Sequence, residues 1–139
     1  MKIAIINGPN LNLLGERQPE VYGFTTLKDL EEQLRNTFPQ HEFEFFQNNN
    51  EGKLIDYVQR CRKQADAIVL NPGAYSHTSV GLADALAAVT IPVVEVHISN
   101  IHSREVFRLR SLTAPHTKGI ISGFGLKGYK MAIDALLQH

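Results

Sequence analysis

A glutamate and a histidine stand two residues apart at the end of a short apolar run, in Glu95-Val96-His97. Residues at that spacing in a β-strand point to the same side of the sheet. The carboxylate can therefore hold one ring nitrogen of His97 and leave the other for a ligand, which suits a general acid. One alternative is a structural Glu–His pair. Another is a metal site that adds His77 and His102, although these residues lack the i, i+4 spacing of zinc-binding histidines.

A second group is an arginine and a tyrosine, Arg17 and Tyr22, on the long segment 7–23. This segment is longer than the ~2–6 residues of an ordinary strand-to-helix connection, which indicates a functional loop. A phenol is only about 0.1% ionised at neutral pH, and a neighbouring guanidinium can lower the pKa of an acidic group by about 1–3 units. Tyr22 could then remove a proton next to a carbonyl group. The alternative is a solvated lid in which Tyr22 packs and Arg17 pairs with Glu16 or Glu20.

Neutral polar side chains follow two of the apolar runs. Asn7, Asn10 and Asn12 offer hydrogen-bond donors and acceptors on the first loop, and residues 71–79 form a polar turn that opens a helix. That turn is either a capped helix start or a place where substrate is hydrogen bonded. Its expected position beside the other two groups favours substrate binding.

Polar and charged groups after the third and fourth apolar runs could bind a substrate or lie at the surface. Ser99 and the backbone amides around Ile98 could dock a substrate carboxylate. Three arginines follow, namely Arg104, Arg108 and Arg110. At least one of them could bind an anion or a hydroxyl group, although helix-face arginines are more often solvated. Asp84 interrupts an alanine-rich apolar segment, so we expect its charge to be exposed, paired or placed at a subunit boundary.

The elements that must position these residues alternate between strand and helix patterns. Five short apolar runs ended by turn residues predict strands, at 3–6, 43–46, 67–70, 93–96 and 119–121. Helical spacing predicts four helices: one capped by Thr25 or Thr26 and ended before Pro39, one carrying Leu54 to Cys61, one starting near Ser79, and one carrying Leu126 to Leu136. Five strand-then-helix units in a row imply a five-stranded parallel sheet covered on both faces, with ligands beyond the carboxyl ends of its strands.

Length and composition favour one domain, 1–139, and exclude several classes of function. Lys+Arg and Asp+Glu both number 14, so the neutral chain lacks the charge expected of a nucleic-acid or anionic-membrane binder. No apolar run approaches the ~18 residues of a membrane span, and the single cysteine, Cys61, fits a reducing compartment, so we expect a cytoplasmic protein.

Familiar cofactor motifs are missing or misplaced. The spacing Gly123-x-Gly125-x-x-Gly128 matches a dinucleotide fingerprint, but it lies in the last unit, so we interpret these glycines as close helix–sheet packing. A phosphate-binding loop is absent. A phosphoacceptor domain would carry magnesium-binding carboxylates where Asn7 and Asn71 stand.

Several motifs, in order along nearly the whole chain, resemble those of type II 3-dehydroquinate dehydratases. They are Ile5-Ile6-Asn7-Gly8-Pro9-Asn10-Leu11-Asn12, Gly15-Glu16-Arg17, Tyr22-Gly23, Asn71-Pro72-Gly73-Ala74, Glu95-Val96-His97-Ile98-Ser99-Asn100, Arg104-Glu105-x-Phe107-Arg108, Gly123-Phe124-Gly125 and Gly128-Tyr129. The resemblance implies a flavodoxin-like three-layer α/β sandwich. It also implies cofactor-free dehydration of 3-dehydroquinate to 3-dehydroshikimate in the shikimate pathway, by anti elimination through an enolate.

The resemblance also implies roles for individual residues. Tyr22 stands at the position of the base, with Arg17 as its electrostatic partner, and His97 at that of the acid, oriented by Glu95. Asn10 corresponds to the residue that steadies the enolate. Substrate-binding positions are matched by Asn71, His77, Ile98, Ser99 and Arg108.

The resemblance further implies an assembly of trimers into a homododecamer, in which Asp84 reaches a neighbouring subunit's site. Leu109-Arg110 departs from the family pattern, in which histidines are common. Two other classes of function stay open: a flavodoxin-like module that binds a nucleotide or flavin without catalysis, and a metal-dependent hydrolase built on Glu95, His97 and His77.

Overall fold

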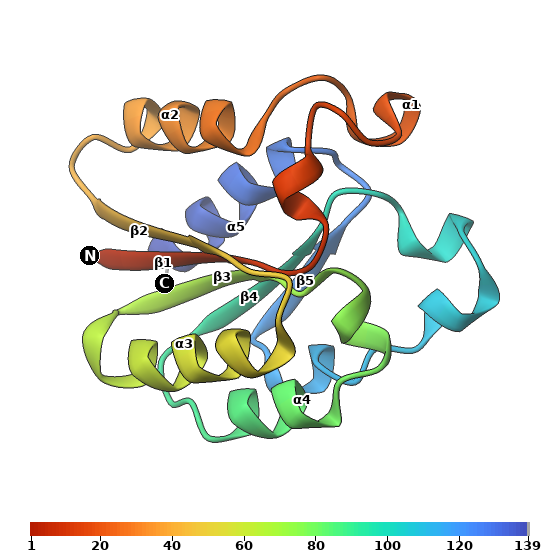
Figure 1. Cartoon of the computed structure of the whole chain (residues 1–139). Coiled ribbons are helices and arrows are strands. Elements are labelled where there is room, and N and C mark those ends of the chain that lie inside the picture. The colour runs from red at the N-terminus through yellow and green to blue at the C-terminus, as the bar shows by residue number, and fades with distance from the viewer. Residues whose placement is uncertain (139) are drawn as a thin grey trace.

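A computed structural model describes residues 1–138, except for the side chains of Val21 and Tyr22. Its centre is a parallel sheet with the strand order β2-β1-β3-β4-β5 (Figure 1). The strands are β1 (Lys2–Asn7), β2 (Glu42–Gln47), β3 (Ala67–Asn71), β4 (Val93–His97) and β5 (Gly119–Ser122). All five predicted strands are confirmed, each within two residues of its predicted bounds.

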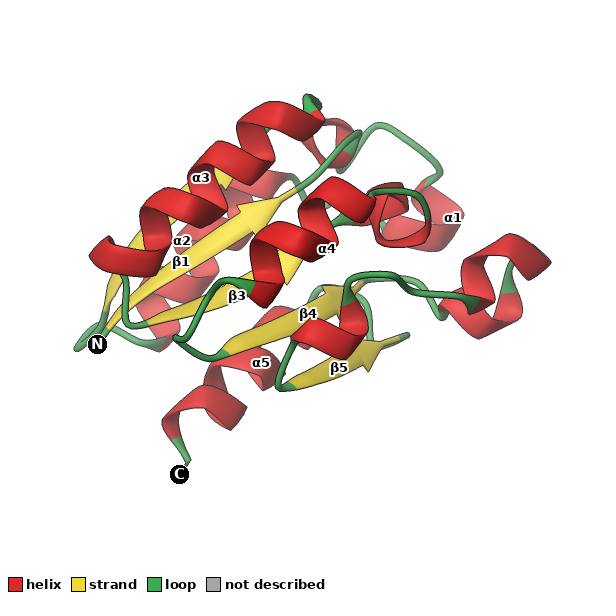
Figure 2. Cartoon of the chain, turned by 90° about the horizontal axis from the view of Figure 1, so that it is seen from below, coloured by secondary structure: helices red, strands yellow, loops and turns green. Residues whose placement is uncertain are grey.

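Helices cover the sheet on both sides and make three layers. Those of the described chain are α1 (Pro19–Tyr22), α2 (Leu27–Thr37), α3 (Glu51–Gln64), α4 (Val80–Ala87) and α5 (Lys127–Leu137). Figure 2 shows α3 and α4 in front of the sheet with α2 and α5 behind it. The predicted flavodoxin-like α/β architecture is therefore confirmed.

Capping side chains explain where three of the helices begin. The Thr26 hydroxyl accepts the backbone N–H of Asp29, and the Asp29 carboxylate accepts that of Thr26. These bonds satisfy amides that have no partner inside the helix, and they lower the pKa of Asp29. Asn50 and Ser79 cap α3 and α4 in the same position. The predicted helix starts at Thr26 and near Ser79 are confirmed.

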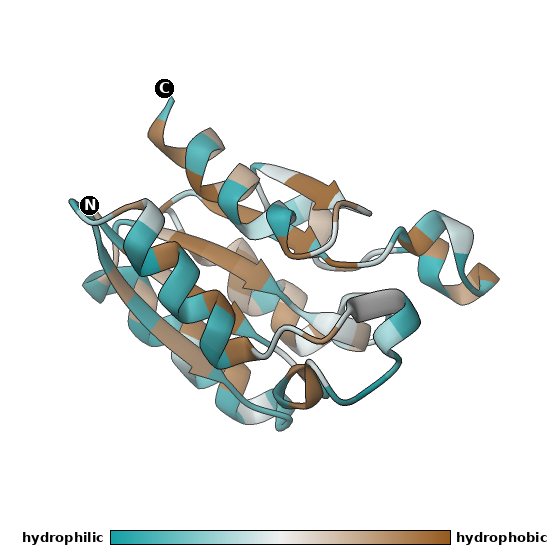
Figure 3. Cartoon of the chain, turned by 90° about the horizontal axis from the view of Figure 1, so that it is seen from above, coloured by the Kyte–Doolittle hydropathy of each residue, from teal (hydrophilic) through white to brown (hydrophobic). Residues whose placement is uncertain are grey.

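The core is split in two by the sheet, because successive strand residues point to opposite faces. Ile3 and Ile5 belong to the cluster under α2 and α5, whereas Ala4 and Ile6 belong to the cluster under α3 and α4. Cys61 of α3 is buried in the second cluster. In Figure 3 hydrophobic colour marks much of the central strands, while hydrophilic stretches alternate along the helices.

The connection between β4 and β5 departs from the predicted strand-then-helix pattern. Residues 98–118 contain three 3-10 helices, at Ile101–Ser103, Val106–Leu109 and Ala114–His116, in place of an α-helix. Part of β5 therefore stays uncovered, and Ile120 is 44% exposed. The expectation that every strand is covered on both faces is wrong here, because much of the segment extends beyond the strand ends (Figure 1).

Strand order reverses between β1 and β3, where this fold forms its ligand crevice. The turns that follow these strands lie very close together. A Cβ atom on Gly8 would come within 2.6 Å of the Pro72 carbonyl oxygen, and Gly73 has a φ of +59° against Pro9. Only glycine permits this approach, so the two turns form one rigid floor beneath the crevice.

Candidate active site

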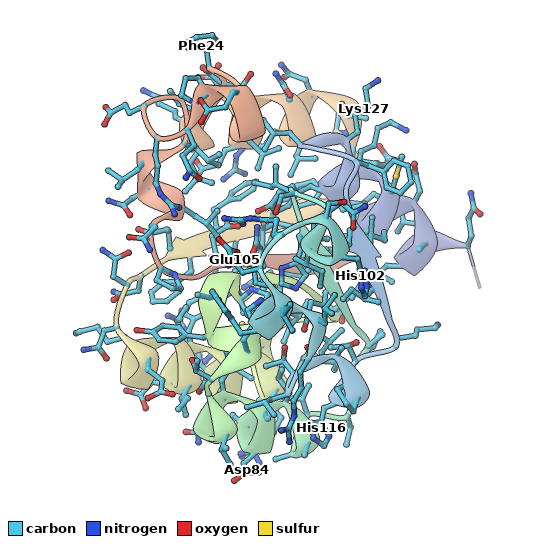
Figure 4. All side chains as sticks on the ribbon, turned by 90° about the vertical axis from the view of Figure 1, so that its right-hand side faces the viewer. Phe24, Asp84, His102, Glu105, His116 and Lys127 are labelled. Atoms are coloured by element: carbon cyan, nitrogen blue, oxygen red, sulfur yellow. The ribbon has the colours of Figure 1, made fainter. Side chains whose placement is uncertain are left out.

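A cavity of about 170 Å³ lies at the carboxyl ends of β1, β3 and β4. Loops that are far apart in the sequence build its walls, as the view onto this edge of the sheet shows (Figure 4). Most of the predicted site residues line it: Asn10, Arg17, Asn71, His77, His97, Ile98, Ser99 and Arg108. The cavity therefore brings together side chains from all three segments that the sequence singled out.

Glu95 and His97 form the hydrogen bond that their spacing predicted. Glu95 Oε2 and His97 Nε2 are 2.7 Å apart, and the two side chains are 0% and 6% exposed. Since a carboxylate only accepts, Nε2 carries the hydrogen in this pair. Nδ1 is then the ring nitrogen that can exchange a proton with a ligand in the cavity. Glu95 does not line the cavity and lies beneath His97.

Two hydroxyl groups that the sequence analysis missed complete the surroundings of Glu95. Thr113 Oγ1 donates to Glu95 Oε1 at 2.5 Å, and Ser111 Oγ lies 3.5 Å from Oε2. Both come from the irregular segment before β5. Every polar atom of this buried carboxylate thus has a partner, which holds its orientation toward His97.

His77 contributes a second imidazole with a defined tautomer. Its Nδ1 lies 2.8 Å from the Arg110 carbonyl oxygen, which only accepts, so Nδ1 carries a hydrogen. In the neutral ring Nε2 is then an acceptor, suited to a ligand hydroxyl group. The His77 ring lies 6.2 Å from the His97 ring at an interplanar angle of 28°. Arg110 therefore contacts His77 through its backbone carbonyl oxygen and not through its guanidinium group.

The segment after β4 supplies polar and basic groups. Arg104 Nη1 donates to Ser99 Oγ at 3.2 Å, and Arg108 Nε donates to Glu105. This contact with Arg108 holds the pKa of Glu105 below its usual range. Arg104 also lines the cavity, although the resemblance assigned it no role. Arg104 and Arg108 thus both line the cavity from this segment.

The first loop reaches the cavity through Asn10 and Arg17. Asn10 has a left-handed backbone, with φ 69°, and its N–H donates to Asn49 Oδ1 at 2.9 Å. The backbone of Tyr22 ends α1, but the side chain of this predicted base lies outside the described residues. Gly15 and Gly23, which flank the part of the loop that carries Arg17, both have positive φ.

Asp84 is separate from the other candidate residues. It is exposed on α4 and does not line the cavity, and Figure 4 shows it at the edge of the molecule, on the side of α4. The expectation that its charge is exposed is confirmed for a single chain.

The C-terminal glycines have mixed roles. A Cβ on Gly128 would meet Val96 at 3.1 Å, which confirms close helix–sheet packing at this position. Gly125 has open space around it and a φ of +63°, so the packing interpretation is wrong there and backbone conformation explains the glycine. Gly123 faces Asn100 in the neighbouring loop instead of a helix.

The described residues contain neither a metal-binding cluster nor a membrane-spanning helix. Within that part of the chain, no three His, Cys, Asp or Glu side chains lie close enough together to hold a metal ion. The helices of the same residues are all too short or too polar to span a membrane.

Known proteins resemble this chain over nearly its whole length. Residues 1–137 match the family model described as Dehydroquinase class II. A 3-dehydroquinate dehydratase from Aliarcobacter butzleri is 54% identical, with 99% of this chain and 85% of the relative covered, and one from Bacillus licheniformis is 56% identical, with 95% and 92% covered. The crystal structure of a type II dehydroquinase from Butyrivibrio crossotus matches with a TM-score of 0.96 and 47% identity, covering 99% of this chain and 98% of that one. With this sequence match, this fold and this cavity, the chain belongs to the class II dehydroquinase family.

Proposed function

We propose that this protein dehydrates 3-dehydroquinate to 3-dehydroshikimate with Tyr22 as the base and His97 as the acid. Membership of the class II dehydroquinase family establishes the overall reaction, and its place in the shikimate pathway follows. The observation that carries the residue assignment is the cavity, which His97, held by the buried Glu95, lines together with Asn10 and Arg17 of the first loop.

The elimination divides into two proton transfers. The phenolate form of Tyr22, stabilised by the Arg17 guanidinium, takes a proton from the carbon next to the ketone, and the electron pair moves to the ketone oxygen as an enolate. The enolate then collapses, the carbon–hydroxyl bond breaks, and His97 protonates the departing oxygen so that water leaves. Tyr22 then releases its proton to solvent and His97 takes one up, so both groups return to their starting states. This reaction needs a base, an acid and neutral hydrogen-bond donors, and it needs no redox cofactor.

Glu95 assists the second transfer by fixing the ring of His97. Its oxygen at 2.7 Å accepts the Nε2 hydrogen, which leaves Nδ1 as the nitrogen that gives a proton to the substrate. Thr113, at 2.5 Å from the other oxygen, prevents the carboxylate from rotating away. The acid is thereby positioned before substrate arrives, which avoids a reorganisation cost during the reaction.

The remaining cavity residues bind the substrate in this proposal. Asn10 steadies the enolate, in part through water. The polar contacts to the rest of the substrate come from Asn71, His77, Ile98, Ser99 and Arg108, all of which line the cavity. His77 suits a substrate hydroxyl group because its Nε2 accepts, and the amides near Ile98 and Ser99 suit a carboxylate.

A single absorbance assay tests this function. Adding 3-dehydroquinate should produce the ultraviolet absorbance of a conjugated enone, at the same rate with and without a chelator. Replacing Tyr22 by phenylalanine or His97 by alanine should reduce kcat by about 10²-fold or more. A Tyr22→Phe variant with unchanged kcat would remove the proposed base, and a rate abolished by chelator would favour the metal-dependent alternative.

We also propose that the protein assembles into trimers and, from these, a homododecamer. Asp84 supports this, because it is exposed and outside its own chain's cavity. The uncovered face at Ile120 supports it too, since an apolar strand face favours burial. A cytoplasmic location fits the single reduced cysteine, Cys61, and cell fractionation tests it.

Mixing two inactive variants tests whether sites are shared between subunits. Asp84→Ala and His97→Ala are denatured and reassembled together in equal amounts. A site regains activity when it has its own His97 and a neighbour's Asp84, which random mixing achieves in about a quarter of sites. Recovery near that fraction supports shared sites, and no recovery, with the assembly verified by light scattering, contradicts them.

A further inference from the structure

The buried hydroxyl group of Tyr129 lies between two asparagine side chains at the switch point of the sheet. Tyr129 comes from α5, near the C-terminus, and is 0% exposed. Its hydroxyl lies 2.5 Å from Asn7 Oδ1 and 2.9 Å from Asn71 Nδ2. Asn7 and Asn71 are paired in register at the ends of β1 and β3. A residue from the far end of the chain thus joins the two strands that define the crevice.

The direction of every hydrogen bond in this group is fixed by a backbone amide. The N–H of Gly73 donates to Asn71 Oδ1 at 3.1 Å, so the oxygen of that side chain faces Gly73 and its nitrogen faces Tyr129. The Tyr129 oxygen accepts from Asn71 and donates its hydrogen to Asn7. Burial raises the pKa of Tyr129, so the hydroxyl keeps that hydrogen at neutral pH.

We propose that Tyr129 is a positioning residue, which holds the Asn71 amide so that its second N–H points to an oxygen of the bound substrate. The Asn71 nitrogen carries two hydrogens, and Tyr129 takes one of them. The other is available on the cavity side, since Asn71 lines the cavity. Tyr129 does not line the cavity and acts only through Asn71. The inference rests on the proposed substrate-binding role of Asn71.

Two properties make this hydroxyl more than a packing contact. The amide of Asn71 is 3% exposed, so without a partner on its inner side it can turn toward that side or leave a buried donor unsatisfied. Tyr129 also links Asn71 to Asn7 through its hydroxyl group, so the orientation of each side-chain amide depends on that of the other. A phenylalanine ring would fill the same space and remove only this control.

The test compares Tyr129→Phe with Tyr57→Phe. Tyr57 is the matched control because it too is buried, 7% exposed, and its hydroxyl donates to Glu44 in the other core cluster, away from the cavity. Each substitution removes one hydrogen-bonded hydroxyl. We expect Tyr129→Phe to raise KM for 3-dehydroquinate, and the dissociation constant of 3-dehydroshikimate by calorimetry, by about 3- to 10-fold. Tyr57→Phe should change neither.

A double-mutant cycle separates positioning from general destabilisation. In an Asn71→Ala background, Tyr129→Phe should have no further effect on KM, because the side chain that it positions is gone. Independent, multiplying effects would overturn the proposal, as would an unchanged KM in Tyr129→Phe. If Tyr129→Phe does not fold, Asn7→Ala, which removes the hydroxyl's acceptor, should raise KM in the same direction, and an unchanged KM there also overturns it. An inactive wild-type protein would instead refute the proposed function.

Discussion

Replacing Glu95 by glutamine gives the sharpest test of the acid half of the proposed elimination. The side chain keeps its size and its buried position, and only its charge and half of its acceptor capacity are lost. The two contacts to examine are Oε2 with His97 Nε2 at 2.7 Å and Oε1 with Thr113 at 2.5 Å. A glutamine can satisfy them in two orientations, and both impair the acid.

If the glutamine oxygen faces Thr113, its NH₂ group faces His97, whose Nε2 must then lose its hydrogen, so the imidazolium form loses its partner. If the oxygen faces His97, the bond persists without its charge. Hydrogen bonds to charged groups contribute about 1.5–3 kcal/mol. His97 must carry a proton on both ring nitrogens before it can protonate the departing hydroxyl group. Because the substitution removes this stabilisation of the protonated ring, we expect kcat to fall by about 10- to 150-fold.

The assay is the enone absorbance at saturating 3-dehydroquinate, with Glu44→Gln measured beside it. Glu44 is a suitable control because it also lies on a strand and accepts from a hydroxyl group, that of Tyr57, outside the cavity. Glu44→Gln should keep the wild-type kcat. A Glu95→Gln enzyme whose kcat stays within threefold of wild type would refute the idea that this carboxylate supports the acid.

Three further predictions follow from the packing and the pKa shifts. Gly8→Ala should lower the thermal unfolding midpoint and kcat/KM together, because the new Cβ would lie 2.6 Å from the backbone oxygen of Pro72. The Cys61 thiol should react with a disulfide reagent at pH 8 only after unfolding, since burial raises its pKa to about 11 and leaves about 0.1% thiolate. The hydrogen bond from Tyr57 holds the pKa of Glu44 below its ordinary 4.5, so the stabilisation is present above that pH and lost as pH falls through the folded-state pKa. The urea midpoint should therefore fall more steeply on acidification in wild type than in Tyr57→Phe, and parallel curves would contradict this.

The features that the sequence predicted are those fixed by short-range rules. Apolar runs ended by turn residues located all five strands, and the capping hydroxyls of Thr26 and Ser79 located two helix starts. The contact between Glu95 and His97 followed from strand geometry alone, because residues two apart share a face. The parallel topology predicted the rest, because it places the carboxyl ends of the strands, and the loops that follow them, at the same edge of the sheet.

The features that it missed depend on how distant segments meet. Thr113 reaches Glu95 across 18 residues, along a path of 3-10 helices that no periodic pattern marks. In the sequence, Tyr129 occupies an ordinary apolar position of an amphipathic helix. Its hydroxyl contact with Asn7 spans 122 residues, so no local pattern indicates it. The uncovered face at Ile120 was missed for a related reason, since an apolar run alone does not tell which element will cover it.

The asparagines at the strand ends connect the fold with the type of reaction. Asn7 and Asn71 occupy the point where strand order reverses, which is where this architecture binds ligands. Carboxylates at these two positions would attract a divalent cation and repel an anionic substrate. The two amides joined by the Tyr129 hydroxyl carry no charge, and the amide of Asn71, which lines the cavity, is held in a fixed direction. An elimination that places negative charge on a substrate oxygen benefits from such donors, because they stabilise the charge without having to reorient. The same position in the sheet can thus serve metal-dependent or metal-free chemistry, depending on whether its side chains are carboxylates or amides.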